Sequence, residues 1–247
     1  MSLVDLLKSN SGDEWFQKIW EEREEKIYPE LFGKLPETVI RLQEQALKAI
    51  LGADAKILPE WLHYGVIEIA PNAHHADWLY ITTGFSQPWN LDKEADLNPN
   101  GRSGTGIEIV MRTSERAGWA VDVLHRLSAY QIGVAGKTIK GKVFTCGDWM
   151  PLNGPIDPGT PNTKVRGILV AQPRDFPPDF SLRSGKVELL QLLGITGQEL
   201  AYLLAKGPTS LEDVLYEQGA APAINPNRES IELPNRFPLP KELQARF

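Results

Sequence analysis

The order of the hydrophobic patterns along the chain limits its fold more than any other feature. Residues 61–69, 78–83 and 105–113 are rich in β-branched and aromatic residues, which predicts three strands. Residues 114–134 carry apolar side chains at steps of three and four, which predicts a helix packed on the sheet. Short strand-like segments and then helices follow, as far as residue 217. This order favours an α+β fold, with a mixed, largely antiparallel sheet and helices packed on it, over a doubly wound fold.

The first 56 residues predict helices. Phe16, Ile19 and Trp20 recur at helical intervals, and Ser11 and Glu14 have the spacing of a capping box before them. The polar face of this helix is a run of glutamates that we expect to be solvated: Glu21, Glu22, Glu24 and Glu25. Pro29 is expected to end or kink the helix, and a second helix is expected over residues 36–51.

The length and composition predict a single domain. The chain has 247 residues, 42% of them apolar, which suffices for one sizeable core, and no linker-like tract divides it. We divide the domain 1–247 into a helical N-terminal portion (1–56), an α+β core (57–235) and a tail (236–247). Residues 87–103, crowded with Pro, Asn, Asp and Gly, predict a long surface loop that is a candidate for binding and for disorder.

Cysteine usage, hydropathy and charge indicate the cellular location and the class of partner. Cys146 is the only cysteine, and the chain opens on polar, mixed-charge residues rather than on a leader pattern, so we expect a cytoplasmic protein. No apolar run approaches the roughly 20 residues of a membrane span. The net charge of −6, to which residues 1–60 contribute −4 through 8 basic and 12 acidic side chains, would repel phosphate backbones. We therefore expect neither a membrane nor a nucleic acid as partner.

Two groups of side chains are candidates for chemistry. His74, His75 and Asp77 could ligate a metal, but adjacent histidines point in opposite directions on an extended chain. Cys146 could act as a nucleophile with Asp148 and a distant histidine as its helpers, but no family signature surrounds the cysteine. We predict no enzyme, no metal and no cofactor. A hydrolase or metal-dependent enzyme built on these residues is the alternative, and a structural or assembly subunit with a large apolar patch is a second one.

Several segments in a fixed order carry a family resemblance. Residues 106–112 read as glycine, glutamate and alternating apolar residues before an arginine, and residues 144–148 read Phe-x-x-Gly-Asp. The series is completed by a helix with Trp119, Leu124, Leu127 and Tyr130, by Pro151-Leu152, by residues 189–215 and by residues 225–231. Over about residues 61–231 this order resembles the suppressor of fused domain.

The resemblance implies a protein-binding role without catalysis. The animal member has a second domain and holds a transcription-factor peptide in a cleft between the two, partly by adding a strand to an exposed sheet edge. This chain is too short for that second domain, so it resembles the single-domain bacterial members. Those members are often taken to be immunity proteins that neutralise toxins, which implies a protein partner here and, in that role, a toxin.

Three residues are candidates for contact with the partner. Tyr130 and Asp148 match positions that the family uses for partner contact, and Trp89 lies in the predicted loop, where an exposed tryptophan is typical of interface hot spots. Each also has a structural interpretation. Tyr130 has the spacing of a helical core residue, Asp148 is an ordinary turn residue, and Trp89 could pin its loop to the core.

Overall fold

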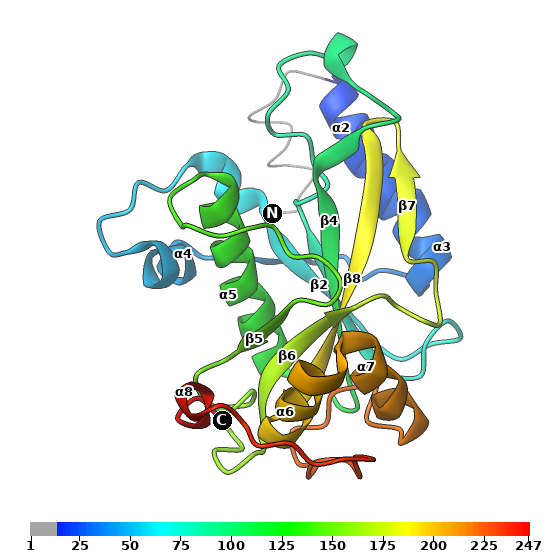
Figure 1. Cartoon of the computed structure of the whole chain (residues 1–247). Helices are drawn as coiled ribbons and strands as arrows, with labels where there is room; N and C mark the ends of the chain where they lie inside the picture. The colour runs from blue at the N-terminus through cyan, green and yellow to red at the C-terminus, as the bar shows by residue number, and fades with distance from the viewer. Residues whose placement is uncertain (1–13) are drawn as a thin grey trace.

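The computed structural model describes residues 14–247, which form one eight-stranded sheet with helices on both faces (Figure 1). The strand order is β1-β2-β3-β4-β8-β6-β5, and β7 pairs with the first part of β8. Only β4 and β8, at the centre, run parallel; the other pairs are antiparallel. The strands are β1 (Ile40–Arg41), β2 (Gly65–Ile69), β3 (Trp78–Thr83), β4 (Arg102–Thr113), β5 (Trp149–Pro151), β6 (Val165–Ala171), β7 (Asp179–Leu182) and β8 (Gly185–Thr196). The predicted fold class is therefore confirmed.

The helices divide between the two faces of the sheet. Helix α5 covers one face, while α2 and α3 cover one half of the other face and α6 and α7 cover its second half (Figure 1). The helices are α2 (Glu14–Glu21), the π-helical η1 (Glu22–Ile27), α3 (Tyr28–Phe32), α4 (Glu44–Leu51), α5 (Gly118–Ala135), α6 (Gly197–Lys206), α7 (Pro208–Glu217) and α8 (Lys241–Gln244), with 3₁₀ turns η2 (Pro59–His63) and η3 (Glu94–Asp96).

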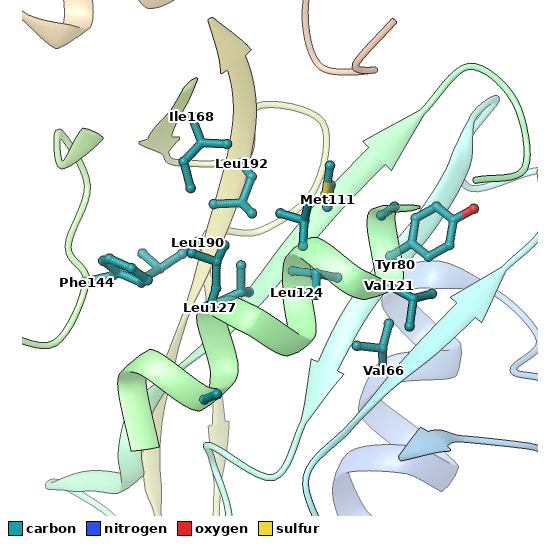
Figure 2. Packing of buried hydrophobic residues seen from close by; sticks show 14 of the residues in the cluster. Val66, Tyr80, Met111, Val121, Leu124, Leu127, Phe144, Ile168, Leu190 and Leu192 are labelled. Carbon is teal, nitrogen blue, oxygen red and sulfur yellow. The ribbon is translucent and has the colours of Figure 1, made fainter. Parts of the chain in front are cut away.

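Helix α5 packs on the central strands through one apolar stripe. Its residues Val121, Leu124 and Leu127 lie three residues apart and point toward the sheet, where Met111 of β4 and Leu190 of β8 meet them (Figure 2). All five side chains are buried. This packing fixes α5, and with it Tyr130, against the middle of the sheet.

Two expectations for the N-terminal portion are corrected: Pro29 does not end the helix, and the second helix does not begin at residue 36. The chain stays helical through Pro29 because the π-helical turns of η1 precede it and α3 restarts with the proline in its first turn. The second helix begins only at Glu44, because Ile40 and Arg41 instead pair with Val66 and Gly65 of β2. The capping box predicted at Ser11 lies outside the described residues.

The glutamate run is also more than a solvated face. Glu24 is buried beside Arg23, whose side chain is only 1% exposed, and their side chains form an ion pair of 2.9 Å. Arg23 also donates to Thr83 Oγ1 at 2.7 Å and to Ser86 Oγ at 3.0 Å. The N-terminal helix is thus attached to the end of β3 through a buried charge network, in keeping with the rule that buried charges are paired.

The loop predicted over residues 87–103 is anchored at both ends. At its start the Trp89 indole N–H donates to Gly84 O at 2.9 Å. At its end β4 begins at Arg102, and the Ser103 hydroxyl bonds to Ser86 O and Ser184. Among residues 14–247 no helix is long and apolar enough to cross a bilayer.

Candidate partner-binding site

The open side of strand β5 is the candidate site. β5 ends the strand order, and its residues Trp149–Pro151 are half-buried. On its paired side, the Val170 N–H donates to Asp148 O at 2.7 Å and the Leu152 N–H donates to Arg166 O at 2.8 Å. Because hydrogen-bonding groups alternate in direction along a strand, the N–H and C=O of Trp149 point away from β6. This edge therefore offers main-chain groups to an added strand.

Asp148 holds the turn that leads into β5. Its carboxylate accepts hydrogen bonds from the Thr145 N–H at 3.0 Å and from Lys142 Nζ at 2.7 Å. Its side chain remains 22% exposed, so a partner can reach it without unfolding the turn. Asp148 is thus both a turn residue and the charged group adjacent to the open edge.

Tyr130 lies on α5 beneath the same segment. Its ring stacks on Phe144 with centroids 5.6 Å apart, and the ring is half-buried. Gly141 passes so close that an added Cβ would lie 2.5 Å from the Tyr130 hydroxyl. Tyr130 and Asp148 therefore contact one stretch, residues 141–148, which connects α5 to β5.

Trp89 lies at a different place in the fold. Its ring is 5.0 Å from Phe16 and 5.3 Å from His63, and it stacks at 28° to the Tyr64 ring. Together with its hydrogen bond to Gly84 O, these contacts pin the loop to the core. Trp89 thus belongs to a separate aromatic cluster and not to the β5 edge.

The groups of the catalytic alternative do not converge. Cys146 Sγ donates to Glu188 Oε1 at 3.5 Å, and burial together with that carboxylate raises the pKa of the Cys146 thiol to about 12. A thiol held in its protonated form is a poor nucleophile. Among the histidines, His63 stacks on Trp89 and His125 bonds to Ile40 O, so in the described part of the chain neither serves the cysteine.

The metal alternative fails on geometry as well. The His75 ring is buried, with its nitrogens within 2.7 Å of Asp77 O and 3.1 Å of Phe32 O. The Asp77 carboxylate instead pairs with Arg112 at 2.9 Å, and His74 is exposed. Within residues 14–247 no group of three His, Cys, Asp or Glu side chains is arranged to hold a metal ion.

Comparison with known proteins identifies the family. The model of the family described as "Suppressor of fused protein (SUFU)" matches residues 60–229, more than half of the chain. The chain belongs to the suppressor of fused family. No curated protein matches this suppressor of fused chain in a sequence comparison.

Solved structures show the same fold. A structure described as the Sufu–Fu complex is 17% identical, with a TM-score of 0.55 over 76% of this chain and 89% of that one. Suppressor of fused from Drosophila is 16% identical, with a TM-score of 0.54, and the match covers 76% of this chain but 49% of that longer one. A putative homologue from Neisseria gonorrhoeae is 18% identical, with a TM-score of 0.50 over 75% of this chain and 94% of that one. At these identities the likeness supports the fold alone.

Sequence reasoning missed the strand edge itself. Trp149 was not a candidate, although Gly147-Asp148 before it and Pro151 after it are signals of a short strand between two turns. Only the pairing of β5 with β6 shows which side of the strand stays open.

Proposed function

We propose that this suppressor of fused chain is a non-catalytic binding protein that receives a protein partner along the open edge of β5. The observation that carries the proposal is the outward direction of the Trp149 main-chain groups next to the exposed part of Asp148. An added strand gains affinity from main-chain hydrogen bonds, while side chains at the ends of the edge give selectivity. Asp148 and Tyr130 are the selectivity residues in this proposal.

The chemistry of the edge indicates the partner segment. Pro151 has no N–H, so donation toward a partner comes from Trp149, while the carbonyls of both residues accept. The Asp148 carboxylate is paired with the 71% exposed Lys142, and a basic side chain at the facing position of the partner strand would take the place of that lysine. We therefore expect an extended segment with a lysine or arginine opposite Asp148.

The biological role we propose is that of an immunity protein in the bacterial cytoplasm that binds and neutralises a toxin. This role is what the resemblance to the single-domain bacterial members implies, and the homologue from Neisseria gonorrhoeae shares the fold. A preformed edge suits such a role, because a partner that supplies its own strand can bind without rearrangement of the sheet.

The two alternatives lack support in the structure. The raised pKa of Cys146 and the structural bonds of His75 argue against an enzyme. A structural or assembly subunit would show a large apolar patch. In the described chain only Ile40 and Leu204 are exposed large apolar residues, at 40% and 43%.

Affinity capture with matched variants tests the edge. The wild-type protein, Asp148→Ala and Asp157→Ala would each be used to retain proteins from the native lysate. Asp157 is the control because it accepts from the Gly159 N–H and the Thr160 hydroxyl in a similar turn. We expect one protein to be retained in stoichiometric amount by the wild type and by Asp157→Ala and to be reduced by Asp148→Ala. Equal retention by both variants would remove Asp148 from the site.

Growth measurements test the immunity role separately. The captured partner would be expressed alone and together with this protein. Arrest of growth by the partner and recovery on co-expression are the expected result. A partner that does not slow growth would exclude the toxin assignment while leaving the binding edge intact.

A further inference from the structure

A second candidate site is a surface pocket of about 320 Å³ between η2, the loop after β3 and the C-terminal end of α5. Its aromatic walls are Trp61, Tyr64 and Trp89. The floor adds apolar groups of Ile132 and Ala135 from the last turns of α5. This pocket is distinct from the β5 edge, and its lining includes neither Tyr130 nor Asp148.

The aromatic walls are fixed before any ligand arrives. Trp89 is held by its hydrogen bond to Gly84 O and by stacking on Tyr64, and Tyr64 packs edge-on against Phe85 at 4.9 Å. Trp61 lies against the end of α5, where its ring is 3.5 Å from the Cβ position of Gly136. Rigid walls lower the entropy lost when a side chain enters.

The electrostatics of the pocket favour a cation. Glu60 is the only charged residue of its lining, and among residues 14–247 its carboxylate forms no ion pair. The C-terminal end of the 18-residue helix α5 adds partial negative charge at Gly136. The exposed Lys137 follows Gly136 but does not line the pocket. Arg23 lies behind Trp89 and is neutralised by its ion pair with Glu24.

We propose that this pocket binds a lysine or arginine side chain of a partner protein. The aliphatic part of such a side chain lies against Trp61 and Trp89, and its charged end reaches Glu60. Aromatic faces attract cations, and an apolar wall with one carboxylate at its rim matches a long side chain that is apolar along its stem and charged at its tip. A neutral side chain would cover Glu60 without pairing it, and an anion would be repelled.

Titration with single-residue probes tests the proposal. The probes are N-acetyl-arginine amide and N-acetyl-lysine amide, with N-acetyl-citrulline amide and N-acetyl-norleucine amide as neutral counterparts. NMR of the indole N–H signals of Trp61 and Trp89 reports binding at the pocket. We expect dissociation constants on the order of 1 mM for the cations. The neutral probes should bind between about twofold and thirtyfold more weakly, the range of a cation–π contact.

Variants separate the pocket from unspecific binding. Glu60→Gln and Trp61→Ala should each weaken cation binding, while Glu94→Gln, which changes an exposed carboxylate outside the lining, should not. If Trp61→Ala proves too destabilised to interpret, Glu60→Gln still tests the pocket. This substitution is nearly isosteric, and an unchanged melting temperature of Glu60→Gln would show that its fold persists. Equal affinity for norleucine and lysine probes, or no shift of either indole signal at 20 mM probe (roughly twenty times the expected constant), would overturn the proposal.

Discussion

Replacing the buried Arg23 with methionine should destabilise the protein more than replacing an exposed arginine with methionine. The guanidinium is 1% exposed and donates to Glu24, Thr83, Ser86 and Gln87. Methionine fills similar space but leaves the buried Glu24 carboxylate without its cation. Removing one partner of a buried ion pair costs about 3–5 kcal/mol. With an m value of about 3 kcal/mol/M, the urea midpoint should fall by roughly 1–1.7 M.

The matched control is Arg183→Met. Arg183 also connects the N-terminal helices to the sheet, through Glu22 at 3.3 Å, but its side chain is 41% exposed. An exposed pair contributes only about 0–1 kcal/mol, so the urea midpoint should shift by at most a few tenths of a molar unit. Urea unfolding followed by tryptophan fluorescence measures both variants under the same conditions.

The pH dependence gives this prediction a second, independent readout. Burial raises the pKa of Glu108 above 4.5, and the charge of Arg23 partly opposes this rise, so Arg23→Met should raise the pKa further. A carboxyl group with a higher pKa in the folded state binds its proton more tightly when folded, and stability falls as pH rises from 4.5 through that pKa. The variant should therefore lose more stability than the wild type between pH 5 and pH 8. If Arg23→Met lowers the free energy of unfolding by less than 1 kcal/mol at pH 8, or by the same amount at pH 5 and pH 8, the reasoning is refuted.

Three further predictions concern other parts of the fold. Because burial and the Glu188 carboxylate raise its pKa to about 12, Cys146 in the folded protein should react with a thiol-specific disulfide reagent at pH 8 roughly tenfold to a hundredfold more slowly than in urea, and Glu188→Gln should speed this reaction. Gly104→Ala should destabilise by about 2–4 kcal/mol in urea unfolding, since Gly104 has a φ of +59° and an added Cβ would lie 2.2 Å from Phe85 O. Thr196→Ala should cost about 1–2 kcal/mol in the same assay, because the Thr196 hydroxyl caps α6 in a capping box.

The hydrophobic pattern of the sequence predicted those elements that bury one face over many residues. The alternation over residues 105–113 predicted β4, and the steps of three and four after residue 114 predicted α5, because each element buries one face over many residues. The short strand β1 could not be predicted in this way. Its two residues, Ile40 and Arg41, are too few to show a periodic pattern, and they form a strand only because β2 supplies their hydrogen-bond partners.

The candidate site also depends on contacts that the sequence alone could not predict. Asp148 and Tyr130 could be named from family positions, but their common contact with residues 141–148 depends on how that segment folds over α5. For Trp89 the sequence left open whether the residue contacts a partner or anchors its loop to the core. The hydrogen bond to Gly84 O supports the anchoring role. Glu24 was predicted to be solvated because a run of glutamates has no sequence signal that marks one member as buried. Its burial follows from the ion pair with Arg23.

The buried network also couples the N-terminal helix to the proposed cation pocket. The family match begins at residue 60, yet the loop that carries Trp89 is supported from before that point. Gln87 accepts from Arg23 and donates to Phe16 O at 2.9 Å, and the Phe16 ring packs on Trp89. One wall of the pocket is therefore held by residues outside the shared domain. A relative that lacks an equivalent of Arg23 needs another support for this loop, so the pocket should vary within the family more than the β5 edge, whose strand pairs with β6 inside the matched residues.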